Sequence, residues 1–280
     1  MAKIIGGYFT SHVPAIGGAI ARGVQDEPYW KPFFDGFPPI RKWLKDEKPD
    51  VAVVFYNDHG LNFFLDKMPT FAVGAAPVYK SADEGWGLPI YKPYDGHPPL
   101  SWHIIDSLVA DEFDITTCQE MLVDHAMSVP FELAWPDADK WPVKLIPIAI
   151  NTVQHPLPSA KRCLALGRAV GKALTSWKGP ERILVAGTGG LSHQLDGARA
   201  GFINPDYDQF CLEHIVNDPE ALTKDSVVKI VERAGTQGVE ILNWIAARGA
   251  LGDLPMRKRM ENYHIPISNT AAASMVLEPA

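Results

Sequence analysis

The sequence predicts an α/β fold: a single domain with a central, mostly parallel sheet that is covered by helices and carries long loops. Short runs of β-branched and aromatic residues alternate along the chain with longer segments that have apolar residues at helical spacing. The 280 residues suffice for one large domain, and neither an internal repeat nor a linker divides them. We therefore expect residues 1–280 to form one domain.

Four apolar runs are expected to form strands. Residues 3–9 are expected to form a strand, and residues 51–56 are a continuous β-branched and aromatic run of the kind found in buried strands. Residues 182–186 are similar to residues 51–56. Residues 143–150 are similar but contain Pro147. Because proline cannot donate a ladder hydrogen bond, it argues against a central position for this strand.

Two segments between these strands are expected to be helices. Residues 159–177 begin with Ser159 as a plausible N-cap and carry apolar residues at helical spacing. Residues 226–248 show the same spacing, with Val227 and Ile241 on one stripe. Residues 60–103 are rich in proline, glycine and aromatic residues and are expected to form a long excursion near a functional site.

Composition excludes several classes of protein. With 26 basic and 33 acidic residues the formal charge is −7, so a broad surface for nucleic acid is not expected. No apolar stretch approaches the roughly 18 residues that span a bilayer, and the N-terminus does not resemble a signal peptide. The three cysteines form neither a zinc pattern nor a disulfide framework. We expect a soluble, cytoplasmic protein with no membrane partner.

Three of the expected strands end in a polar segment that carries a histidine: His12, His59 and His193. Ligands of α/β sheets bind at the carboxyl ends of the strands, so three histidines there indicate a shared site rather than three unrelated residues. A glycine-rich turn, residues 187–190, precedes His193 and would let its ring approach a ligand closely. Neutral imidazole is the commonest metal ligand in proteins, which makes a metal site the first candidate.

Two histidines and a carboxylate form the facial triad of non-heme Fe(II), and zinc accepts the same ligands. The candidate carboxylate is Glu240, which lies among apolar residues in the expected helix 226–248. A buried glutamate in such company needs a partner, and a metal would supply one. From the residues alone, however, a surface glutamate paired with Arg233 or Arg248 is the simpler interpretation.

Two other chemistries are weakly indicated. The turn at residues 187–190 lacks both the full dinucleotide-binding pattern and the lysine of a P-loop. Ser192 lies beside His193 but outside any nucleophile-elbow motif, so a serine hydrolase is disfavoured.

His125 follows Asp124 in an apolar setting and is a candidate to line a pocket.

Taken together, these motifs resemble the class III extradiol ring-cleavage dioxygenases. Six segments occur in the order found in that family, and the resemblance covers essentially the whole chain. They are Ser11–Pro14, Asn57–His59, Asp124–His125, Gly187–Leu195, Ala234–Glu240 and Ile267–Ala271. Within the family, the sequence is most similar to the catalytic subunits of two-subunit enzymes that cleave protocatechuate.

The resemblance implies a role for seven residues in a single catalytic domain with long active-site loops. His12, His59 and Glu240 would be the ligands of Fe(II). His193 would be the catalytic acid–base. His125 and Asn57 would lie near the substrate, and Ser268 near the polar groups of the aromatic ring.

The resemblance also implies the reaction and the partners. The substrates would be O2 and a catechol-type aromatic acid, with protocatechuate cleaved at its 4,5 position to 4-carboxy-2-hydroxymuconate semialdehyde. Gallate-cleaving members of the family are longer and carry the small-subunit region fused to the catalytic chain. The 280 residues leave no room for that region, so a separate small helical α subunit would complete a hetero-oligomer. The alternatives are gallate or 3-O-methylgallate as substrate and, in a different class, a zinc-dependent hydrolase or a non-catalytic relative.

Overall fold

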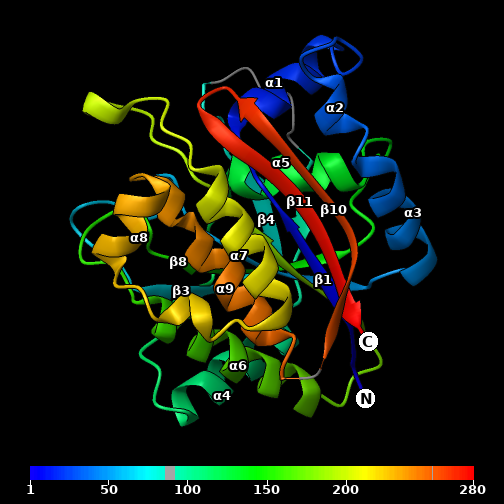
Figure 1. The fold of residues 1–280 in the computed structure, drawn as a ribbon. Helices are drawn as coiled ribbons and strands as arrows, with labels where there is room; N and C mark the ends of the chain where they lie inside the picture. Colours follow the sequence, from blue (N-terminus) through cyan, green and yellow to red (C-terminus); the bar gives the residue numbers. More distant parts are fainter. Residues whose placement is uncertain (86–91, 254) are drawn as a thin grey trace.

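The computed structural model describes residues 1–85, 92–253 and 255–280, and most of its strands form one large sheet (Figure 1). The strands of this sheet are β1 (Lys3–Thr10), β2 (Val51–Tyr56), β3 (Phe71–Gly74), β6 (Thr116–Cys118), β8 (Lys144–Ile150), β9 (Arg182–Thr188), β10 (Met256–Ile267) and β11 (Thr270–Pro279). A smaller sheet contains β4 (Val78–Ser81), β5 (Tyr94–Asp95) and β7 (Leu122–Val123).

The spatial order of the large sheet is β10-β11-β1-β9-β2-β8-β3-β6. Its centre, β1, β9, β2 and β8, is parallel throughout. The β10–β11 hairpin extends one edge and pairs antiparallel to β1, whereas β3 runs antiparallel to β8. The carboxyl ends of the central strands therefore meet at one edge of the sheet.

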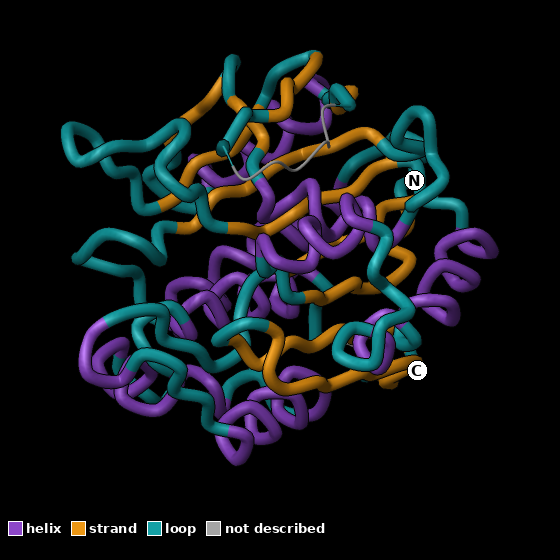
Figure 2. Tube along the Cα trace, turned by 90° about the horizontal axis from the view of Figure 1, so that it is seen from above, coloured by secondary structure: helices purple, strands orange, loops and turns teal. Residues whose placement is uncertain are grey.

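Helices cover both faces of the sheet. They are α1 (Pro14–Arg22), α2 (Lys31–Phe34), α3 (Phe37–Glu47), α4 (Pro98–Ala110), α5 (His125–Ala134), α6 (Ala160–Ser176), α7 (Pro205–Asn217), α8 (Val227–Ala234) and α9 (Ile241–Ala250). Short 3₁₀ turns span Gly197–Arg199, Ala221–Thr223 and Gly238–Glu240. Figure 2, seen from above, shows the strands passing through the molecule with helices outside them.

The alternation of side chains along β2 shows how each face is buried. Val53 and Phe55 join the core beneath α4, α6, α7, α8 and α9, whereas Val54 and Tyr56 join the core beneath α1, α2, α3 and α5. Figure 1 shows these two groups of helices on opposite sides of the strands. The predicted α/β class with a mostly parallel, helix-covered sheet is thus confirmed. No helix in the described part of the chain is long and apolar enough to cross a membrane.

The four predicted strands are present as β1, β2, β8 and β9, and the predicted cap of α6 is confirmed. The hydroxyl of Ser159 accepts a hydrogen bond from the backbone N–H of Arg162 at 3.2 Å. The expectation that Pro147 argues against a central strand is wrong, because β8 pairs with both β2 and β3. Pairing with β3 stops at Ile148, so Pro147 lies where that ladder has ended, beside Gly74, which has no side chain to collide with it.

The single helix expected over 226–248 is wrong. The chain forms α8, then a turn, then the 3₁₀ segment Gly238–Glu240 and α9. Helix α8 ends at Ala234; the next residue, Gly235, has a φ of +90°, and a Cβ there would lie 2.2 Å from the carbonyl oxygen of His193. The chain must pass this close to the His193 backbone, and only glycine permits it. Glu240 consequently lies at the start of a helix rather than within one.

The excursion expected over residues 60–103 contains β3, β4, β5 and the beginning of α4. Three short strands therefore tie it to the two sheets, and most of its other described residues are loop. Residues 86–91 of this excursion lie outside the described residues.

Candidate active site

One cavity at the carboxyl edge of the sheet, of about 630 Å³, gathers the residues singled out from the sequence. Its lining includes all seven of them: His12, Asn57, His59, His125, His193, Glu240 and Ser268. They come from the ends of β1, β2 and β9, the starts of α5 and α9, and the β10–β11 turn. The parallel centre of the sheet thus collects residues that lie far apart in the sequence.

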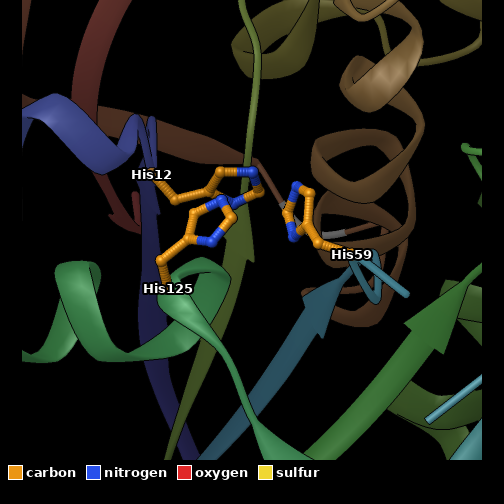
Figure 3. A group of neighbouring side chains, drawn as sticks. All are labelled: His12, His59 and His125. Carbon is orange, nitrogen blue, oxygen red and sulfur yellow. The ribbon is translucent and has the colours of Figure 1, made fainter. Parts of the chain in front are cut away.

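Three imidazole rings face one another in this cavity (Figure 3). The ring centroids of His12 and His59 lie 5.1 Å apart, and those of His59 and His125 lie 4.0 Å apart. One ring nitrogen from each of the three lies within 4.8 Å of the others. Such spacing suits side chains that share one ligand.

Glu240 completes this cluster and is only 6% exposed. Its Oε1 lies 3.4 Å from Nε2 of His12 and 3.7 Å from Nε2 of His59. Its Oε2 accepts a hydrogen bond from the backbone N–H of Gly190 at 2.7 Å. A Cβ on Gly189 would lie 2.9 Å from this carboxylate, so the glycine-rich turn makes room for Glu240 as well as leading to His193.

The simpler interpretation of Glu240, a surface residue paired with Arg233 or Arg248, is wrong. Arg233 pairs with Asp225 at 2.7 Å, and Arg248 donates to the carbonyl oxygens of Ile215 and Gly252. Glu240 instead faces histidines in the cavity.

The two histidines nearest to Glu240 are oriented by hydrogen bonds on their far sides. Nδ1 of His12 lies 3.1 Å from the hydroxyl of Thr188, and Nδ1 of His59 lies 2.9 Å from Oδ2 of Asp124. When these Nδ1 atoms carry the proton, each Nε2 presents a lone pair to the cavity. Asp124 also accepts from the backbone N–H of His59 and caps α5 through Ala126.

The electrostatics of the cluster favour a positive charge. Burial of the His59 ring disfavours its charged form, but Asp124 and Glu240 outweigh this and raise the pKa of His59 to about 10. Burial likewise opposes ionisation of Asp124, yet the adjacent His59 lowers the pKa of Asp124 to about 2. Burial also opposes ionisation of Glu240, but His12 and, after it, His59 outweigh this effect and hold the pKa of Glu240 well below its usual range.

These atoms fit a metal ion. Nδ2 of Asn57 lies 3.1 Å from Nε2 of His59 and donates a hydrogen bond to Oε1 of Glu240 at 3.1 Å, so these two atoms lie on either side of one amide group and close to each other. Nε2 of His12 lies 3.4 Å from the same carboxylate oxygen. Two imidazole nitrogens and one carboxylate oxygen form the donor set of non-heme Fe(II), and zinc also accepts it.

His193 lies beside this group with one ring nitrogen free. Its Nδ1 lies 2.9 Å from the carbonyl oxygen of Leu191 and must therefore carry a proton. Its Nε2, 4.0 Å from Oε2 of Glu240, is left as a proton acceptor. The backbone N–H of His193 donates to the carbonyl oxygen of Ala234 at 2.7 Å, which fixes the turn in place.

His125 has a partner that sequence reasoning missed. Glu84 Oε1 lies 2.6 Å from Nδ1 of His125, and Glu84 Oε2 accepts from the backbone N–H of the same residue at 2.7 Å. Burial, followed by the neighbouring His59, lowers the pKa of His125. Glu84 is separated from His125 by 41 positions, and no local pattern links the two.

Ser268 borders the cavity from the tight turn between β10 and β11. Its φ of +55° is unusual for a residue other than glycine. The hydroxyl of Tyr29 accepts a hydrogen bond from its backbone N–H at 2.9 Å, which ties the turn to the loop after α1.

Comparisons with known proteins agree with this arrangement. A gallate dioxygenase of Pseudomonas putida is 37% identical over 197 residues, which are 70% of this chain and 57% of that protein. A 2,3-dihydroxyphenylpropionate/2,3-dihydroxicinnamic acid 1,2-dioxygenase of Photorhabdus laumondii is 33% identical over 203 residues, 71% of this chain and 59% of that protein. The chain thus spans less than two thirds of the length of these two relatives.

Another 2,3-dihydroxyphenylpropionate/2,3-dihydroxicinnamic acid 1,2-dioxygenase, from Cupriavidus necator, is 28% identical over 280 residues and matches 83% of this chain and 86% of its own. Among solved structures, an uncharacterised protein of Escherichia coli K12 superimposes with a TM-score of 0.60 at 16% identity, covering 97% of this chain and 99% of that one. That likeness shows a shared fold.

The model of the family described as the catalytic LigB subunit of aromatic ring-opening dioxygenase matches residues 6–277. This match takes in all but the two ends of the large sheet and every residue of the cluster just described. The chain therefore belongs to the LigB family of aromatic ring-opening dioxygenase catalytic subunits.

Proposed function

We propose that the protein is an Fe(II)-dependent extradiol dioxygenase, with His12, His59 and Glu240 as the metal ligands and His193 as the acid–base. The observation that carries this proposal is the convergence of two imidazole Nε2 atoms on one carboxylate oxygen of Glu240, beside a histidine whose Nε2 is free. When bound, Fe(II) supplies open coordination positions for a catechol and O2 and lets electron density pass between them.

The residues of this chain do the remaining work. Nε2 of His193 would accept the proton of one catechol hydroxyl and would later return a proton to the opening substrate, because Nδ1 is held by the carbonyl oxygen of Leu191. Glu84 holds Nδ1 of His125, so that Nε2 of His125 faces the substrate as a hydrogen-bonding group. The glycine-rich turn brings His193 to the ring without making it a ligand of the metal.

For the substrate we propose protocatechuate, cleaved beside the diol to give 4-carboxy-2-hydroxymuconate semialdehyde. This choice is supported by the sequence motifs. Gallate is the second candidate, because the P. putida relative bears the name gallate dioxygenase. 3-O-Methylgallate remains a third, since a metal site of this kind does not distinguish these diols.

Oxygen uptake tests this proposal. Anaerobically purified, Fe(II)-loaded protein is mixed with protocatechuate, gallate, 3-O-methylgallate or 2,3-dihydroxyphenylpropionate, and O2 consumption and the product spectrum are recorded. We expect one O2 per ring opened with at least one of these diols, and a semialdehyde product with protocatechuate. Stoichiometric zinc in the purified protein, with no O2 consumed by the iron-loaded form, would instead support the zinc-dependent hydrolase.

We further propose that a small helical α subunit covers the mouth of the cavity in a hetero-oligomer. An apolar rim supports this: Phe64, Leu65, Val153 and Leu195 are 56%, 82%, 56% and 55% exposed. Val153 and Leu195 border the active-site cavity, and Phe64 and Leu65 border a second hollow that shares Val153. Contiguous exposed apolar residues of this kind mark protein interfaces. A cytoplasmic location is part of the same proposal.

A further inference from the structure

We propose that Arg22 binds the carboxylate of the substrate and selects diols that carry one; this inference rests on the proposed function and names the substrate class of that site. Arg22 is the last residue of α1 and borders the cavity that holds His12 and Glu240. Among the described residues that line this cavity, it is the only lysine or arginine. A positive charge is thus available where an aromatic acid would bind.

Arg22 differs from the other arginines of the chain. Each of the other nine makes a hydrogen bond, an ion pair or a contact with an aromatic ring; examples are Arg41 with the carbonyl oxygen of Leu133 and Arg162 over the ring of Phe113. The side chain of Arg22 makes none of these with residues 1–85, 92–253 or 255–280. Within the described residues, therefore, no partner occupies the five N–H donors of its guanidinium.

The helix that carries Arg22 is shaped to hold an aromatic ring beside it. Pro14, Ala15, Gly18 and Arg22 all border the cavity, and their spacing of three to four residues places them on one face of α1. Pro14, Ala15 and Gly18 make this face apolar and nearly flat, and Arg22 follows them at the end of the helix. It begins two residues after His12, so it leads from the proposed metal ligands to a positive charge.

Gly18 leaves room for the guanidinium of Arg22 on this face. A Cβ on Gly18 would be 3.1 Å from Nη1 of Arg22, so the side chain runs back along the helix over the glycine. Long helical side chains lean in this direction, toward the N-terminus and here toward His12. A guanidinium in this place can bind a carboxylate through two parallel N–H···O bonds, which a lysine cannot reproduce.

Two pairs of diols test the inference. Protocatechuate differs from catechol, and gallate from pyrogallol, only by the carboxylate. We expect Arg22→Gln to raise KM for each acid about tenfold or more relative to its neutral partner, which corresponds to one charge-assisted hydrogen bond. Arg22→Lys should recover part of this selectivity. In the wild type, KM for the acids should rise with ionic strength more than KM for the neutral diols.

Arg259→Gln is the matched control, because it removes the same charge near the end of β10 remote from Ser268. It should leave the acid-to-neutral ratio of KM unchanged. An Arg22→Gln variant that keeps the wild-type ratio, or that raises KM equally for acid and neutral diols, would overturn the assignment of Arg22.

Failure of the proposed function is distinguishable from failure of this inference. If the wild type consumes no O2 with protocatechuate, gallate, 3-O-methylgallate or 2,3-dihydroxyphenylpropionate, the proposed function fails. The role of Arg22 is then decided by calorimetric Kd values for the two acid and neutral pairs, protocatechuate with catechol and gallate with pyrogallol, under anaerobic conditions. A preference for the acids that disappears in Arg22→Gln supports the assignment, and equal preferences in the two proteins contradict it.

Discussion

At the scale of single residues, Asp124 connects the proposed metal site to the fold. It accepts hydrogen bonds from the backbone and the ring of His59 and also caps α5 through the backbone N–H of Ala126. Carboxylates that orient a ligating histidine in this way fix its tautomer and strengthen it as a ligand. One side chain therefore supports both a ligand of the proposed metal site and the start of a helix.

We predict that Asp124→Asn weakens Fe(II) binding about 10–100-fold. His59 and Ala126 now use both carboxylate oxygens of Asp124, whereas an amide offers a single acceptor oxygen. Competition with a chelator measures the affinity, and chemical denaturation measures the free energy of unfolding. Ser159→Ala is the control, since it removes the cap of α6 and lowers the free energy of unfolding by about 1 kcal/mol at another place. Unchanged metal affinity in Asp124→Asn would contradict the positioning role.

His193→Phe separates metal binding from chemistry. We predict that this variant still binds Fe(II) and a catechol, because His193 is not among the proposed ligands, while turnover falls about 10²–10⁴-fold with loss of the acid–base. Iron content, circular dichroism and O2 uptake are measured on one preparation. Loss of iron with the fold intact would make His193 a ligand, and loss of both would make it structural.

The residues of the site were predictable from the sequence to different degrees. His12, His59 and His193 follow strands directly, so a local pattern places them at one edge of a parallel sheet. Glu84 and Thr188 were not singled out, because their contacts with His125 and His12 depend on how distant segments pack. Neither contact leaves a periodic signal in the sequence.

At the scale of elements, the close packing of α6 against α9 positions Glu240. A Cβ on Gly167 of α6 would lie 1.9 Å from the carbonyl oxygen of Ala246 in α9, and a Cβ on Gly249 of α9 would lie 2.6 Å from the carbonyl oxygen of Leu164 in α6. Glycines at these positions let the two helix backbones touch. Helix α9 begins at Ile241, the residue after Glu240. The position of α9 therefore also determines where the carboxylate of Glu240 lies in the cavity.

We predict that Gly167→Ala destabilises the protein by roughly 1–3 kcal/mol, since the added methyl collides with backbone rather than with a flexible side chain. Iron occupancy should fall in parallel as α9 shifts. Thermal unfolding and iron analysis check both effects. Ala165→Ser adds one heavy atom to the exposed face of the same helix and should change neither. Equal melting temperatures for Gly167→Ala and the wild type would exclude this packing role.

The elements themselves were predicted best where apolar runs are continuous. β1, β2 and β9 are buried on both faces, and their composition reflects this. The break between α8 and α9 was missed because apolar spacing continues across it, whereas the break is imposed by the backbone of His193 approaching Gly235. Tertiary contact, not helix propensity, ends α8.

At the scale of the whole molecule, the apolar rim of Phe64, Leu65, Val153 and Leu195 bears on activity. A covered cavity excludes water and orients the substrate. We predict that the isolated chain turns over its diol weakly and that a co-expressed small helical subunit restores activity. Leu65→Asp should weaken the association measured by light scattering. Val228→Asp, an exposed position on α8, is the control. Full activity of a monomeric chain would refute the need for a partner.

The central claim is that Glu240 joins His12 and His59 in holding the metal. The most direct test is the iron content of anaerobically reconstituted Glu240→Gln beside that of the wild type, with circular dichroism recorded on both. The variant keeps an acceptor for the backbone N–H of Gly190 but loses the negative charge. We predict a wild-type fold with iron and O2 uptake lost; a variant that retains full iron and full turnover would contradict the account.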